Sequence, residues 1–222
     1  HLHLAFEAAE RYDLPTSRKH LNASLELGHN SAQALRALAV MAADTPSRLR
    51  LYAAAWEAST AVPASDPAAF RLKQSLAAEL TFTLRKHAQD LSLPKSDADA
   101  AWEELRRRLD EFDTLHIARD TTAAGDEFSV SRAASALHRA DADGVLSELK
   151  SHTYAHYPHG LRKELTNLWF GALYMKAESK KGRPLSAIER KAIMFDLANA
   201  PPPNVGVINR PQFSAPAGVN WP

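Results

Sequence analysis

The chain has 222 residues, of which 45% are hydrophobic and 24% are charged, and this composition excludes a disordered or a fibrous protein. Its 27 basic and 26 acidic residues give a formal net charge of +1, so no overall positive charge marks it as a nucleic-acid-binding protein. The absence of cysteine excludes disulfides, zinc–thiolate sites, iron–sulfur sites and thiol catalysis. No run of 18 apolar residues occurs, so we expect no membrane-spanning segment.

Apolar residues recur at helical spacing through residues 1–118, which we expect to form a repeat-like helical half. The predicted helices cover residues 2–12, 17–28, 31–43, 47–60, 67–91 and 97–117. Leu14-Pro15 should separate the first two helices, and Thr45 and Asp66 should each cap a helix that begins with proline. Gly28 is expected to end the second helix.

A polar loop at 119–127 is expected to precede a second helical half, residues 128–200, packed on the first. Its predicted helices cover residues 129–140, 144–156, 161–180 and 186–199. Ser186 and Glu189 have the spacing of a capping box for the last of these. Residues 201–222 contain six prolines and should form an extended tail. The predicted class is therefore all-α, with antiparallel helical hairpins arranged as an α-solenoid or an irregular bundle.

Several residues are expected in the core because they lie on apolar helical stripes. Leu4 and Phe6 should be buried in the first helix, and Trp56, Trp102 and Trp169 in later ones. A narrow seam in the sixth helix is formed by Trp102, Leu105, Leu109, Phe112 and His116.

Residues 18–41 read RKHLNASLELGHNSAQALRALAVM, and this segment resembles a Sel1-like repeat, a relative of the tetratricopeptide repeat. Gly28 and His29, followed by Ala32 and Gln33, fit that family's pattern, whereas Leu35 lies one residue early and no second clean copy follows. The resemblance implies a non-enzymatic adaptor, assembly factor or inhibitor that binds another protein on stacked helix pairs. The family includes bacterial immunity proteins that neutralise a secreted toxin.

Histidines concentrate in the segment SHTYAHYPHG, where His152 and His156 are four residues apart and His159 follows Pro158. Neutral imidazoles at such spacing can bind zinc, and Glu148 or Glu164 could then act as a general base. A metal-dependent hydrolase is therefore one alternative function. The other interpretation is a helix end where positive charge is favourable.

Basic residues outnumber acidic ones between residues 146 and 191, and tyrosines lie among them. This stretch could bind an acidic protein surface or, as a third alternative, nucleic acid, which the overall charge makes unlikely. The candidate partner-binding residues are Lys150, Tyr154, Tyr157, Arg162 and Lys163.

The sequence favours a non-enzymatic, protein-binding helical protein, an adaptor or an inhibitor, with no catalytic residues and no cofactor. It contains no nucleophile motif and no phosphate-binding glycine loop. Its compartment, the bacterial periplasm or the cytoplasm, stays open, with a slight preference for the periplasm.

Overall fold

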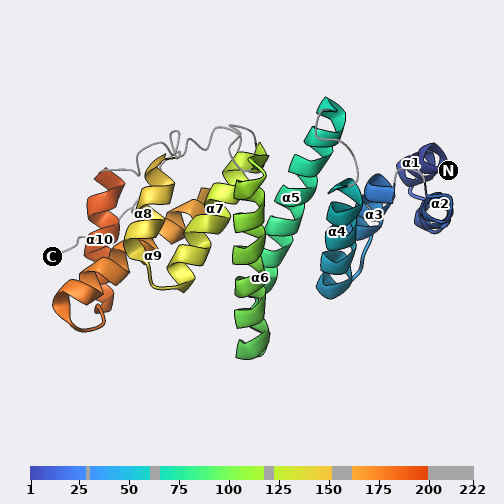
Figure 1. The fold of residues 1–222 in the computed structure, drawn as a ribbon. Coiled ribbons are helices and arrows are strands. Elements are labelled where there is room, and N and C mark those ends of the chain that lie inside the picture. The colour runs from blue at the N-terminus through green and yellow to red at the C-terminus, as the bar shows by residue number, and fades with distance from the viewer. Residues whose placement is uncertain (29–30, 61–65, 118–122, 152–161, 200–222) are drawn as a thin grey trace. The chain divides into compact units, whose positions relative to one another are not determined.

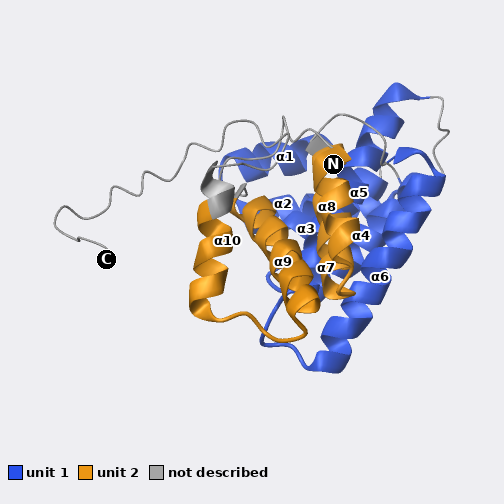
Figure 2. Ribbon diagram, turned by 90° about the vertical axis from the view of Figure 1, so that its left-hand side faces the viewer, with its two compact units in different colours: residues 1–120 blue, residues 121–222 orange. Residues whose placement is uncertain are grey.

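The computed structural model describes residues 1–28, 31–60, 66–117, 123–151 and 162–199; of residues 123, 124, 162 and 196–199 it describes the backbone alone. In this part of the chain the secondary structure is helical without any strand, which confirms the predicted all-α class (Figure 1). The helices are α1 (Leu2–Glu10), α2 (Leu14–Glu26), α3 (Ser31–Val40), α4 (Thr45–Thr60), α5 (Pro67–Ala88), α6 (Lys95–Thr114), α7 (Ala123–His138), α8 (Ala142–Ser151), α9 (Arg162–Lys181) and α10 (Ala187–Asn199). Two compact units, residues 1–120 and 121–222, are described separately below (Figure 2).

Aspartates begin three helices of the first unit. The side chains of Asp13, Asp44 and Asp66 accept hydrogen bonds from backbone N–H groups at 3.1, 2.7 and 2.8 Å, which satisfies donors that a first helical turn leaves free. The cap at Asp66 was predicted. The start of α2 was placed too late, because Pro15 lies in its first turn instead of separating two helices. Thr45 is likewise the first residue of α4, and Asp44 is the cap.

Three further expectations about helix ends differ from the structure. Helix α6 begins at Lys95, directly after Pro94, and so earlier than predicted. His116 lies beyond the end of α6 with a positive φ of 58° and is exposed, so it is not part of the apolar seam. Helix α7 already begins at Ala123, and part of the predicted loop at 119–127 is therefore helical.

The N-terminal core is built from small and medium side chains of successive helices. Ala5, Leu21, Ala34 and Leu38 form a buried cluster, and Leu51 of α4 packs against it. Leu4 and Phe6, predicted to be buried, are 46% and 47% exposed, because α1 turns Ala5 and Ala8 toward α2 instead. All three predicted core tryptophans are buried, which confirms that expectation.

Helices of the first unit lie side by side in chain order, each packed on the next (Figure 1). One bridge skips a helix: Trp56 of α4 is 1% exposed, and its Nε1 donates to Glu111 Oε1 of α6 at 2.7 Å. The Trp56 ring also meets Phe112 edge-on at 4.8 Å between centroids. Arg108 Nη1 lies 3.0 Å from Glu111 Oε2 and so holds that carboxylate in place.

A second bridge joins α3 to α5. Arg36 Nε donates to both carboxylate oxygens of Glu79, at 3.1 and 3.0 Å. Tyr52 of α4 lies beside this ion pair, and burial together with the Glu79 carboxylate raises the pKa of its hydroxyl to about 12. Helix α3 therefore contacts both α4 and α5, and α4 contacts both α5 and α6.

Locally, the segment that resembles a Sel1-like repeat forms the helix pair α2 and α3. Gly28 has a φ of +68° and follows the last turn of α2, so it ends the helix as predicted. Ala32 is buried in the first turn of α3 and Gln33 is exposed, whereas His29 lies outside the described residues. Membership of that family stays a prediction.

The second unit centres on α7, α8 and α9, which pack on one another. Asp141 caps α8 by accepting a hydrogen bond from the N–H of Gly144 at 2.9 Å, so residues 141–144 form the turn that starts this helix. Gly171 of α9 faces Leu137 of α7 so closely that an added Cβ would lie 3.1 Å from two of its methyl carbons. The absence of a side chain at residue 171 thus lets these two helices approach closely.

Candidate partner-binding surfaces

Of the candidate binding residues from the sequence, Lys150 and Lys163 are described, and both are exposed. Arg162 begins α9, with its side chain undescribed. The remaining members of both predicted clusters lie outside the described residues: Tyr154, Tyr157, His152, His156 and His159. The metal site and the basic–aromatic binding site therefore stay predictions.

The candidate general base Glu148 has a partner in the structure, since Arg132 Nε lies 3.3 Å from its Oε1 and joins α7 to α8. Among the residues that the structure describes, no group of three or more histidines and carboxylates is arranged to hold a metal ion. None of the helices in that same part of the chain has the length and hydropathy needed to cross a bilayer.

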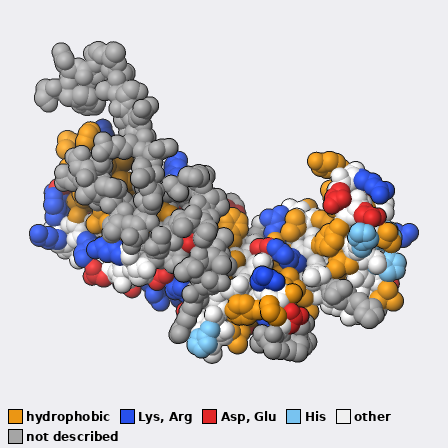
Figure 3. Space-filling view, turned by 90° about the horizontal axis from the view of Figure 1, so that it is seen from above, with side chains coloured by type: hydrophobic (Ala, Val, Ile, Leu, Met, Phe, Trp, Pro, Cys, Tyr) orange, Lys and Arg blue, Asp and Glu red, His pale blue; other side chains and the backbone are white. Residues whose placement is uncertain are grey.

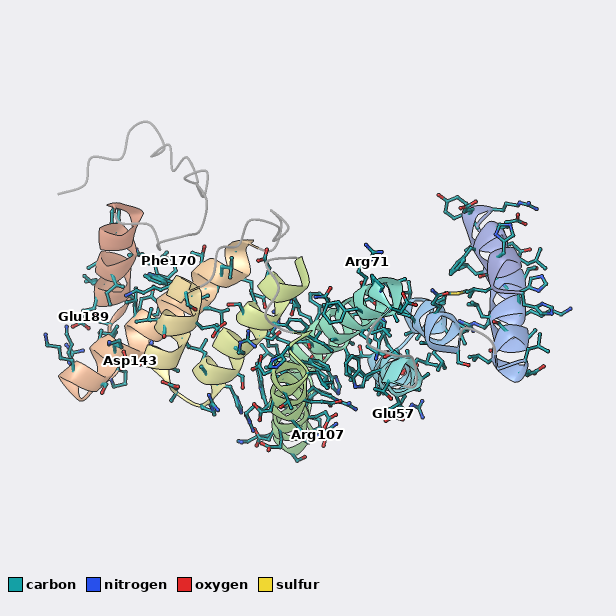
Figure 4. The ribbon with its side chains drawn as sticks, turned by 45° about the horizontal axis from the view of Figure 1, so that its top comes forward. Glu57, Arg71, Arg107, Asp143, Phe170 and Glu189 are labelled. Atoms are coloured by element: carbon teal, nitrogen blue, oxygen red, sulfur yellow. The ribbon has the colours of Figure 1, made fainter. Side chains whose placement is uncertain are left out.

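Several basic residues of the 146–191 stretch form ion pairs within the second unit. Lys176 Nζ lies 2.6 Å from Asp143 Oδ1 of α8, a residue labelled in Figure 4. Arg190 pairs with Glu178 at 3.2 Å. Figure 3 shows lysine and arginine side chains beside aspartate and glutamate on the face that it presents. Basic residues that are paired in this way are less available to an acidic partner than the excess of basic residues in the sequence suggested.

The turn between α9 and α10 is a dense polar junction around Glu189, labelled at the start of α10 in Figure 4. Gly182 provides the required positive φ of 66°. Ser186 and Glu189 form the predicted capping box, with the N–H of Ser186 donating to Glu189 Oε2 at 2.7 Å. Arg183 donates to the same carboxylate at 2.7 and 3.0 Å, and Lys181 also pairs with it. These hydrogen bonds, that from Arg183 first, hold the pKa of Glu189 well below its usual range.

Polar groups also hold the first turns of α10 against α9. Glu178 Oε1 accepts from Arg190 and, at 3.1 Å, from the N–H of buried Leu185. The Arg190 guanidinium lies over the Tyr174 ring at 5.7 Å, a cation–π contact. The Tyr174 ring in turn stacks on Phe170 of α9 at 6.0 Å (Figure 4). Helix α10 is thus fixed to α9 largely through charged and aromatic side chains.

The opposite side of α10 is apolar and faces away from α9. Ile188 and Phe195, two helical turns apart, are 80% and 74% exposed, and Met194 is 44% exposed. Residues 187, 191 and 192 on the same side are also exposed; they are Ala187, Lys191 and Ala192. Surface helices normally bury their apolar side and expose their polar side, so this arrangement is largely inverted; Ile193 is the one large apolar residue in the described part of α10 that is half-buried. We call this surface, Ala187, Ile188, Lys191, Ala192, Met194 and Phe195, the α10 outer face.

Other exposed apolar residues in the described part of the chain are more dispersed. Leu4 and Phe6 project from different sides of α1, and Leu91 lies alone in the turn after α5. A hollow along one side of α2 has a mixed lining, in which Leu14, Pro15 and Ala23 lie beside the polar residues Arg18, Lys19, Asn22 and Glu26. Exposed apolar residues that occur singly are ordinary, whereas a contiguous apolar side of a helix marks an interaction surface.

Sequence reasoning missed the α10 outer face although its signal is present. Ile188, Ala192 and Phe195 recur at intervals of four and three residues, which predicts one apolar side of a helix. Only the bounds and the capping box of this helix were predicted from the sequence, and nothing was drawn from the apolar spacing. The contacts of Glu189 and Arg190 determine the orientation of the helix, and these contacts are visible only in three dimensions.

Comparison with known proteins identifies no relative: no family model, no curated protein and no solved structure matches the chain.

Proposed function

We propose that the protein is a non-enzymatic binding protein, an adaptor or an inhibitor, and that it captures another protein through the α10 outer face. The observation that supports this proposal most directly is the inverted orientation of α10. Its polar side is used for attachment to α9, and Ile188 and Phe195 remain exposed to water. Covering large apolar side chains is favourable by about 1.5–3 kcal/mol each, so a partner would gain from docking there.

The chemistry of the α10 outer face favours a protein helix or strand with an apolar side as its ligand. Lys191 is the single charged residue of the surface, so an acidic residue in the partner would complement it. Nucleic acid would require several unpaired cations to contact its phosphates. The proposed partner therefore has an apolar stripe bordered by acidic residues, which suits an adaptor or a toxin-neutralising immunity protein.

A matched pair of variants tests this function. Ile188→Glu with Phe195→Glu places charges on the α10 outer face. Leu91→Glu introduces the same residue at an exposed leucine far along the chain, outside that surface. Complexes cross-linked in the native host and captured on each form would be compared by quantitative mass spectrometry. The purified partner would then be titrated by calorimetry.

The partner should bind wild type and Leu91→Glu equally and should bind the double variant at least about 100-fold more weakly. This estimate corresponds to the loss of two apolar contacts. Equal binding by all three forms would contradict the proposed surface. Failure of both wild type and Leu91→Glu to capture any protein would contradict the proposed function.

A further inference from the structure

The sequence continues directly after α10 with a segment that contains apolar residues of its own. Helix α10 ends at Asn199, and the sequence continues with Pro201, Pro202 and Pro203, which cannot extend the helix. Phe195 is four residues before the helix end, and Ile188 is seven residues earlier, about 10 Å along the axis. The apolar residues of the α10 outer face therefore begin less than two turns before the point where the tail starts.

Length and sequence of the tail fit this surface. At about 3.1 Å per residue for an extended proline-rich chain, residues 200–208 span roughly 28 Å, enough to turn and run back past Ile188. Val205, Val207 and Ile208 fall in this interval, within four consecutive residues of the sequence. An apolar part of the tail can thus be brought onto the apolar side of the helix.

We propose that residues 201–222 fold back so that Val205, Val207 and Ile208 dock on the α10 outer face. Tethering favours this occupant over any free ligand, because a short linker gives an effective concentration in the millimolar range. Even a weak apolar contact is then populated. If the proposed function also holds, the tail competes with the external partner, and this consequence alone rests on that function.

Because the chain contains no cysteine, a single spin label can be attached at Lys191→Cys, within the α10 outer face. Amide signals of the tail would then be recorded in the full-length protein with the label oxidised and reduced. Docking predicts loss of the signals of residues 205–208 in the oxidised form. The same label in a protein that also carries Ile188→Glu and Phe195→Glu keeps the tether and removes the apolar contact, so these signals should return. A label at Ser147→Cys, an exposed position on α8, gives the background.

A second readout uses an environment-sensitive apolar dye. Val205→Ser with Val207→Ser and Ile208→Ser should raise dye fluorescence severalfold over wild type, because the α10 outer face becomes free. Ile188→Glu and Phe195→Glu added to these changes should abolish the increase. In the spin-label experiment, the broadening of the amide signals could instead fall smoothly from residue 200 onward and be the same with and without the two glutamates. The tail would then be tethered without docking, and the proposal would be overturned.

The two proposals fail in different ways. If Ile188→Glu with Phe195→Glu abolishes partner binding but leaves the broadening of the tail signals unchanged, the binding function is retained and tail docking is rejected. If the spin label broadens the signals of residues 205–208 only when Ile188 and Phe195 are present, and no partner protein is captured, tail docking is retained and the binding function is rejected. If both hold, the triple-serine tail variant should bind the partner more tightly, in proportion to the fraction of chains whose surface it frees.

Discussion

The bridge between α4 and α6 makes a quantitative prediction about Trp56. Trp56→Phe removes the indole N–H that donates to Glu111 at 2.7 Å while keeping an aromatic ring against Phe112. A hydrogen bond to a charged group contributes about 1.5–3 kcal/mol, and the smaller ring adds a modest packing loss. We expect the free energy of unfolding to fall by about 2–4 kcal/mol.

Trp169→Phe is the matched control in the second unit. Trp169 is also buried, yet its Nε1 has no hydrogen-bond partner among the described residues. Removing a donor that is already unsatisfied avoids its desolvation cost and offsets part of the lost packing. The free energy of unfolding should therefore change by about 1 kcal/mol or less.

A double-mutant cycle isolates the pair itself. Glu111→Gln alone also weakens the contact with Arg108. The change in the free energy of unfolding of this single variant therefore overstates the contribution of the Trp56 hydrogen bond. Urea unfolding followed by circular dichroism, with a separate fit for each unit if two transitions appear, would give all four stabilities. A coupling energy of about 1.5–3 kcal/mol is expected. A value below about 0.5 kcal/mol would refute the argument that this contact joins the two helices.

Three further predictions concern titration and capping. The raised pKa of Tyr52, about 12 against roughly 10 in an unfolded chain, means that its contribution to stability is complete below pH 10 and is lost as the pH rises toward 12. Tyr52→Phe should remove this part of the alkaline loss, as measured by urea unfolding across that range. The lowered pKa of Glu189 means that its contribution is present above about pH 4.3 and is lost as the pH falls. The protection of α10 amides from deuterium exchange, relative to the intrinsic exchange rate at each pH, should therefore fall in acid, and in Glu189→Gln it should be low already at neutral pH. Asp141→Ala should cost about 1 kcal/mol through the lost cap of α8, whereas Asp143→Ala, which breaks an exposed ion pair, should cost under about 0.5 kcal/mol in the same unfolding assay.

Local signals in the sequence were sufficient for the helical class and for much of the core. Asp66, Gly28 and the Ser186–Glu189 pair act on backbone groups within a few residues, so their effect on helix ends is encoded nearby. Trp56 and Trp102 recur with other apolar residues at helical spacing, and this local pattern was sufficient to predict their burial.

Interactions between distant residues could not be predicted in this way. The Arg36–Glu79 and Trp56–Glu111 contacts join residues 43 and 55 positions apart, and nothing in the local pattern pairs them. Phe6 lies at the edge of the buried stripe of α1, where periodicity does not distinguish core from surface. The same limitation applies to α10, because a helical wheel defines an apolar side without showing what that side faces.

The contacts that skip a helix in the first unit also affect how it yields under load. A row of helices joined to adjacent neighbours alone would peel apart one helix at a time when its ends are pulled. Here Arg36 links α3 to α5 and Trp56 links α4 to α6, so each contact spans the helix in between and the four helices are joined by more than their adjacent contacts. Extension by optical tweezers should therefore release residues 31–117 in a single rip, and substitution of Glu79 together with Glu111 should divide that rip into smaller steps.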